Sequence, residues 1–135
     1  MITDRAILDA FFEECDDLLA ALADGLSNMR AGQTDNETVN AVFRAVHSIK
    51  GAAGAFSMDE LVEFAHSFET VLDDLRAAKL SADETLLRVL QRAGDVLSDL
   101  VDDAREDRPA DRARVDPVLS ELQGFLAAEP AAEDE

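Results

Sequence analysis

Several residue types are rare in this sequence, and each shortage narrows the possible functions. Its 135 residues include no tryptophan, no tyrosine, one cysteine, two histidines and three prolines. The single cysteine, Cys15, has no partner for a disulfide within the chain, so we expect a reducing compartment and a buried thiol that packs as a small apolar side chain. Because the seven phenylalanines are the only aromatic residues, we expect a mainly aliphatic core. The length fits one domain.

Positive charge is also scarce. Twelve Lys and Arg stand against 30 Asp and Glu, which gives a formal net charge of -18. Phosphate backbones and anionic lipid headgroups repel so acidic a chain, which argues against nucleic acid or a membrane surface as a partner. No uncharged apolar run approaches the roughly 18 residues that a membrane span needs, and the amino-terminal residues lack the pattern of an export signal. We therefore expect a cytoplasmic protein.

The hydrophobic pattern predicts helices and no other regular structure. Apolar residues recur at intervals of three and four and never alternate over a sustained stretch. The first helix is expected from residue 4 to about residue 30, with Thr3 as its N-cap. Its apolar stripe is Ile7, Leu8, Phe11, Cys15, Leu18, Leu22, Leu26 and Met29. The second helix is expected from near Asp35 to near Ala55, with a stripe of Val39, Val42, Phe43, Val46 and Ile49.

Two pairs of residues have the spacing of a capping box, in which a serine and a glutamate satisfy each other's backbone amides. Ser57 with Glu60 predicts the start of a third helix. Ser81 with Glu84 predicts the start of a fourth helix, which should end near Arg105.

The remaining residues predict a connection and a short last helix. Residues 106–115 are charged, contain Pro109 and show no clean stripe, so we expect a loop there. Asp116 followed by Pro117 is a favoured pair at the N-cap and first position of a helix. This fifth helix should end at Pro130.

Four long amphipathic helices with short connections pack most simply as an antiparallel up-and-down four-helix bundle. The predicted fold is therefore all-α, with the short C-terminal helix lying against the bundle. We expect residues 1–128 to form this domain, as a monomer, and residues 129–135 to be an acidic tail or the start of a linker.

The sequence lacks most signatures of an enzyme. It has no glycine-rich phosphate loop, no dinucleotide fingerprint, no nucleophile elbow and no zinc-protease motif. His47 and His66 are the only side chains whose ordinary titration falls near neutral pH. Together with one glutamate they are too few to predict a metal site.

His47 lies off the apolar stripe of its helix and should be exposed. Gly51 and Gly54 follow one and two turns later on the same side, so the wall beside the imidazole is almost free of side chains. Each glycine costs a helix about 1 kcal/mol relative to alanine, which suggests that they give a partner close access to His47. The alternative is a fraying helix end or a close helix crossing.

Three further residues come near His47 if the second and third helices form a hairpin. Lys50 lies one turn away and offers a cation that could hold a phosphoryl group. His66 and Glu69 share one face of the third helix. A carboxylate that accepts a proton from one imidazole nitrogen leaves the other nitrogen free to attack, and Glu69 is the candidate. The alternative for each is a solvated surface residue.

Residues 45–56 read AVHSIKGAAGAF. They are followed by Leu61, Ala65, His66, Glu69, Leu72 and Arg76. This pattern resembles the histidine phosphotransfer domain, and more narrowly the first domain of chemotaxis kinases of the CheA type. The likeness is dense over residues 43–76, and the five-helix plan extends it over most of the chain.

The resemblance implies a domain that carries a phosphoryl group without catalysing its transfer. His47 would be the phosphoacceptor, Glu69 would orient its imidazole, and Lys50 and His66 would flank the phosphoryl group. The partners would be a CheA-type kinase domain, which supplies ATP and Mg²⁺, and response-regulator receivers of the CheY and CheB type. The domain itself would bind no cofactor. The alternative is a scaffolding bundle whose histidines are incidental.

Overall fold

The computed structural model describes residues 2–127, and helices are the only regular secondary structure over that range. Its five helices are α1 (Ile2–Arg30), α2 (Asn36–Ala55), α3 (Asp59–Arg76), α4 (Glu84–Arg105) and α5 (Arg112–Ala127). The all-α prediction is therefore confirmed. The expected domain end at residue 128, the tail at 129–135 and the helix stop at Pro130 lie outside the described residues.

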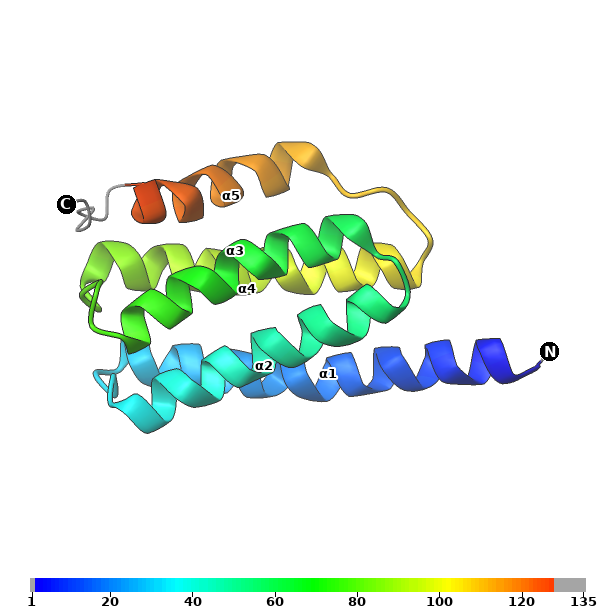
Figure 1. Ribbon diagram of the computed structural model, residues 1–135, viewed down its shortest axis with the longest axis horizontal. Helices are drawn as coiled ribbons and strands as arrows, with labels where there is room; N and C mark the ends of the chain where they lie inside the picture. The colour runs from blue at the N-terminus through cyan, green and yellow to red at the C-terminus, as the bar shows by residue number, and fades with distance from the viewer. Residues whose placement is uncertain (1, 128–135) are drawn as a thin grey trace.

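The first four helices form a ring in which each contacts two neighbours. α1 packs against α2 and α4, and α3 packs against the same two helices. α5 lies on α3 and α4 along the side of the bundle away from α1 (Figure 1). This arrangement confirms the up-and-down four-helix bundle with an additional C-terminal helix. Among residues 2–127, no helix is long and apolar enough to cross a membrane.

The core is built from the predicted stripes and is aliphatic apart from a few phenylalanines. The largest fully buried side chains are Phe64, Phe68, Leu22, Met29, Ile49, Leu72, Leu86, Leu90, Leu97, Leu122, Val42 and Val46. Ile7 is an exception, because half of it is exposed. In Figure 1 the amino-terminal turns of α1 extend past the ends of the neighbouring helices, so this part of the stripe has little to pack against.

The starts of the helices were predicted unevenly. α2 begins next to Asp35, as expected, and Asp35 is its N-cap, since its carboxylate accepts from the Thr38 amide at 3.3 Å. Thr3 lies inside α1, which begins at Ile2, so its predicted role as N-cap is wrong. For α4 the N-cap is Asp83 and not Ser81. The longer aspartate side chain lies directly before the helix and accepts from the amide of the third helical residue.

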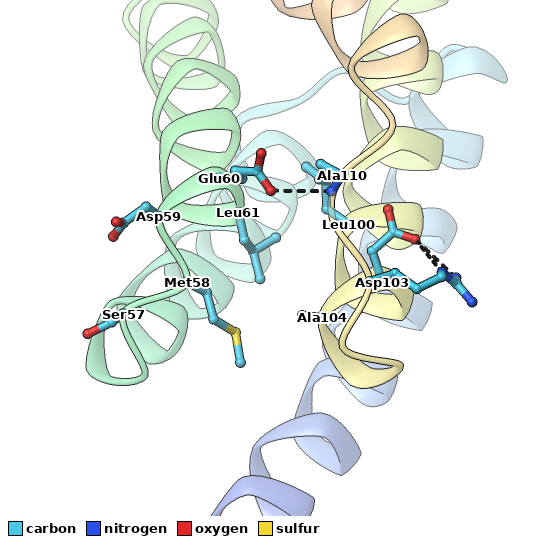
Figure 2. A pocket seen from close by; sticks show the side chains of 10 residues that line it. Ser57, Met58, Asp59, Glu60, Leu61, Leu100, Asp103, Ala104 and Ala110 are labelled. Carbon is cyan, nitrogen blue, oxygen red and sulfur yellow. Dashed lines mark hydrogen bonds and ion pairs between the residues drawn. The ribbon is translucent and has the colours of Figure 1, made fainter.

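The capping box predicted at the start of α3 does not form. Ser57 has a φ of 58° and belongs to the turn that ends α2, so Met58 occupies the cap position without a side-chain bond. Figure 2 shows Ser57 directed away from Glu60, whose carboxylate accepts instead from the amide of Ala110 at 3.3 Å. Glu60 thus joins the start of α3 to the connection before α5.

α5 begins earlier than predicted. It starts at Arg112, so the last residues of the expected loop are helical and Pro117 lies inside the helix. Val115 is buried, so this part of α5 packs against the bundle. The charged residues around Val115 mask this apolar contact in the sequence pattern. An ion pair between Arg112 and Asp116 at 2.6 Å spans the same first turns.

α1 and α2 approach each other closely at Gly25. A Cβ atom at this position would lie 2.5 Å from Cγ2 of Val42, a side chain with no solvent exposure. A β-branched valine in a helix has one strongly preferred rotamer and cannot easily move aside. Gly124 of α5 is different, because a Cβ atom there meets nothing within 4 Å.

Gly25→Ala is therefore expected to destabilise the domain by about 1–3 kcal/mol through overpacking. Gly124→Ala is the matched control and should stabilise it by up to about 1 kcal/mol, the difference in helix propensity. Urea unfolding followed by circular dichroism measures both. The cost of Gly25→Ala should shrink in a Val42→Ala background, and an unchanged cost there would show that the crossing is not the cause.

Cys15 is fully buried in α1, which agrees with its predicted role as a packing residue. Burial raises the pKa of its thiol to about 12, against the smaller lowering effect of Arg105. The thiolate is the reactive form of cysteine, so the native thiol should be inert.

We expect Cys15 to resist a thiol reagent such as dithionitrobenzoate in the folded protein at pH 8. The same reagent should react with it fully in 6 M guanidinium, roughly a denaturing concentration for most domains. The time course of absorbance in the two conditions is the measurement. Rapid labelling of folded protein would mean that the thiol is accessible and that its surroundings do not suppress ionisation.

Candidate functional site

The site lies where α2 and α3 run side by side in opposite directions. His47 of α2 meets Glu69 of α3, while Asn40, earlier on α2, meets Arg76, later on α3. His47 Nδ1 donates a hydrogen bond to Glu69 Oε2. The imidazole is exposed, with 59% of the side chain accessible, whereas the glutamate is 11% accessible. The predicted pairing of these two residues is thus present.

Lys50 uses the second oxygen of the same carboxylate. Its Nζ lies 2.5 Å from Glu69 Oε1, and 24% of the lysine side chain is accessible. Burial raises the pKa of the Glu69 carboxyl, but the hydrogen bonds from Lys50 and His47 outweigh it and lower that pKa below its ordinary value of 4.5. Glu69 is therefore an anion at neutral pH, with each oxygen held by a different residue of α2.

This geometry makes His47 a candidate nucleophile. A carboxylate accepts hydrogen bonds, so the Nδ1 atom facing Glu69 carries the ring proton. In a neutral imidazole the other nitrogen then holds a free lone pair. Nε2 of His47 is that atom.

The two glycines of α2 leave the site accessible. A Cβ atom at Gly51 or Gly54 would meet nothing within 4 Å. A close helix crossing is therefore not the reason for these glycines, and that interpretation is wrong. Both residues lie within α2, which continues to Ala55. Their position agrees with an open approach to His47.

His66 is placed less closely. It lies on α3 one turn before Glu69 and is exposed, and its carbonyl accepts from the Thr70 hydroxyl at 2.8 Å. Within residues 2–127, no hydrogen bond or ion pair joins its imidazole to His47, Lys50 or Glu69. Its suggested role beside a phosphoryl group stays a prediction.

Sequence reasoning assigned no site role to Phe43, which contacts His47, or to Arg76, which contacts Phe43. Phe43 was assigned to the apolar stripe of its helix, but it is only half-buried, and its ring stacks on His47 with centroids 5.9 Å apart and planes 9° apart. Arg76 places its guanidinium carbon 3.8 Å from the centroid of Phe43. The spacing of four residues between Phe43 and His47 is the signal that indicates their contact.

The imidazole of His47 lies on the exposed surface of the bundle. The hollow in Figure 2, about 270 Å³ in volume, is lined by the turn after α2, the first turn of α3, the end of α4 and the connection to α5. His47, Lys50 and Glu69 are not among its lining residues. In the described part of the chain, no three His, Cys, Asp or Glu side chains gather as a metal site requires. Any second reactant must therefore approach His47 from outside.

Comparisons of the sequence with known proteins give a consistent family. The model of the Hpt domain matches residues 6–123. The chain is 49% identical over 123 residues to the chemotaxis protein CheA of Rhizobium meliloti (strain 1021), an alignment that covers 91% of this chain and 16% of that protein. It is 51% identical over 132 residues to the chemotaxis protein CheA of Cereibacter sphaeroides, covering 94% and 19%. The chain thus spans less than a fifth of these two relatives.

Solved structures have the same fold. The phosphorylated P1 domain of CheA3 in complex with CheY6 from R. sphaeroides superposes with a TM-score of 0.82 at 22% identity, covering 92% of this chain and 98% of that one. The histidine phosphotransfer domain of CheA, solved in solution, superposes with a TM-score of 0.78 at 25% identity and covers 93% of both chains.

The lowered pKa of Glu69 makes a prediction about stability. Because the carboxyl releases its proton more readily in the folded state, its ionised form stabilises the fold above pH 4.5, and this contribution is lost as the pH falls through the lower folded value. Glu69→Gln lacks this contribution, so the stability difference between the two proteins should narrow as the pH falls below 4.5.

Urea unfolding from pH 7 to pH 3 measures this difference. Glu63→Gln, an exposed change on the same helix, is the matched control and should follow the wild type throughout. If wild type and Glu69→Gln lose stability in parallel, the carboxylate does not contribute through its ionised form.

Proposed function

The chain belongs to the Hpt domain family, and on that premise we propose that it is the phosphoacceptor module of a chemotaxis-type two-component system. His47 takes a phosphoryl group from ATP held by a CheA-type kinase domain and passes it to an aspartate of a receiver domain. The observation that carries this proposal is the exposed imidazole whose Nδ1 is bonded to the buried Glu69, with Nε2 open to a partner.

In the first transfer the lone pair on Nε2 of His47 attacks the γ-phosphorus of ATP. The N–P bond forms, the bond from phosphorus to the bridging oxygen breaks, and ADP leaves with that electron pair. Such a reaction asks the acceptor mainly for position and for charge stabilisation. His47 meets the first demand because Glu69 holds its Nδ1.

Glu69 also stabilises the positive charge that develops on the imidazole ring. When Nε2 gains phosphorus and Nδ1 keeps its proton, the imidazole becomes cationic, and the carboxylate at Nδ1 stabilises that cation. Lys50 balances the carboxylate before transfer. An ammonium has three N–H donors, so those not facing Glu69 are available for the oxygens of the phosphoryl group.

In the second transfer the N–P bond formed in the first step breaks, and the phosphoryl group moves to the receiver. A carboxylate oxygen of the receiver attacks phosphorus, the N–P bond breaks, and its electron pair returns to Nε2. The neutral imidazole is then restored with its proton still on Nδ1. The structurally similar P1 domain of CheA3, solved phosphorylated and in complex with CheY6, supports receivers of the CheY type as partners, and we extend this to the CheB type.

The nucleotide, Mg²⁺ and the catalytic groups belong to the partners in this proposal. The carboxylate at the site is already engaged by His47 and Lys50, which leaves it no free oxygen for a metal ion. The chain is then a substrate and carrier of the reaction and binds no cofactor of its own. Because its phosphoryl donor is ATP, we place the domain in the cytoplasm.

A scaffolding bundle with incidental histidines is the alternative function. In a scaffold, His47 and Lys50 would serve only to pair the buried carboxylate of Glu69, and the open Nε2 on a side chain that is 59% accessible would have no role. The scaffold makes a separate prediction, which is that no kinase phosphorylates the chain.

The decisive experiment incubates the domain with labelled ATP, Mg²⁺ and a CheA-type kinase domain. Wild type should acquire label that is lost in acid and stable in alkali, as expected for a phosphorus–nitrogen bond. His47→Gln should acquire none. When a CheY-type receiver is then added, the label should move from the wild-type domain to the receiver.

His66→Gln is the matched control, because it removes the other histidine and leaves the acceptor in place. It should still be labelled, at a reduced rate. Label that persists in His47→Gln would place the acceptor elsewhere, and wild type that stays unlabelled with every matched kinase domain would favour the scaffold.

A further inference from the structure

One hydrogen bond is not enough to aim the lone pair of His47. The bond from Nδ1 to Glu69 fixes one atom of the imidazole, but 59% of the side chain is exposed and the ring can still tilt about that contact. In-line attack needs Nε2 to point along the axis of the bond that breaks. A second contact that restrains the plane of the ring would therefore help to fix the direction of Nε2.

Phe43 supplies such a restraint. It precedes His47 by one helical turn, and the two rings lie nearly parallel, with an angle of 9° between planes and 5.9 Å between centroids. A flat ring at this position limits tilting of the imidazole toward the amino-terminal side of α2. Glu69 restrains the same imidazole from α3, so the two contacts come from different directions.

Phe43 is itself held from α3. The guanidinium carbon of Arg76 lies 3.8 Å from the centroid of its ring, within the range of a cation–π interaction. Arg76 donates from Nη1 to Asn40 at 3.2 Å and from Nη2 to Asp73 at 2.6 Å. Its planar head is thus fixed on both sides, and the phenylalanine beneath it has little freedom to turn.

We propose that Phe43 is a positioning residue for His47 and that Arg76 holds it in place. Glu69 fixes Nδ1, Phe43 fixes the ring plane, and together they set the direction in which Nε2 points. This inference rests on the proposed function of His47 as phosphoacceptor and adds what determines the orientation of the acceptor. In this proposal Phe43 and Arg76 act through the imidazole of His47 and not on the phosphoryl group.

The contact itself is tested without any phosphorylation. The ring current of Phe43 should shift the imidazole carbon-bound proton resonances of His47 in the NMR spectrum. Phe43→Leu keeps an apolar side chain and should remove that shift, whereas Phe43→Tyr keeps the aromatic ring and should retain it. Phe125→Leu, a half-buried change on α5, is the matched control and should leave both resonances in place.

The effect of Phe43 on phosphoryl transfer is tested with the labelled ATP assay. The initial rate of labelling is measured at several concentrations of the domain, which gives kcat and KM. Phe43→Leu should lower kcat for phosphorylation of His47 by about tenfold, a modest part of what misplacement of a reacting group can cost, and should leave KM unchanged. Phe43→Tyr should restore kcat. Arg76→Gln, which removes the cation and keeps a polar chain, should give an intermediate loss.

The outcomes separate this inference from the proposed function. If wild type and Phe43→Leu are phosphorylated at the same rate while the ring-current shift is lost, Phe43 does not position His47 and the phosphoacceptor function stands. A change in KM alone would make Phe43 a docking contact and overturn the positioning role. If wild type itself is never phosphorylated, the proposed function fails and the positioning role fails with it.

Discussion

The buried carboxylate of Glu69 is the constraint on which the arrangement of α2 and α3 depends. An ionised group with so little solvent needs partners for both of its oxygens, because an unpaired buried charge is very unfavourable. His47 and Lys50 provide them from successive turns of α2. The register of the two helices is thereby tied to the chemistry, since a slip of one helix past the other would break both contacts.

Much of this could be predicted from the sequence, because the relevant signals are local. Intervals of three and four residues gave the helices, and the spacing of His66 and Glu69 put the carboxylate on the face next to the apolar stripe. A hairpin of neighbouring helices then brings it to His47. What the sequence could not show is that Lys50 turns inward to the same carboxylate, because that choice depends on how deeply the carboxylate is buried.

The errors have a common physical origin. Ser57 and Ser81 have side chains that can cap a helix, but neither lies at the cap position. Ser57 lies in a turn and has a positive φ, and Asp83 directly precedes the first amides of α4. Val115 and Phe43 show the same effect on burial. One became core in a charged segment, and the other became half-exposed on an apolar stripe, because the neighbouring helices determine burial.

The exposed position of His47 has a consequence for the order of events in the proposed exchange. Only one protein at a time can cover a single reactive atom on one exposed face. The kinase domain and the receiver therefore compete for the same binding surface around His47. At His47 the exchange is then a ping-pong sequence, in which the kinase domain leaves the imidazole before the receiver reaches it. Throughput depends on how fast the first partner departs, and tight binding by either one slows the relay as a whole.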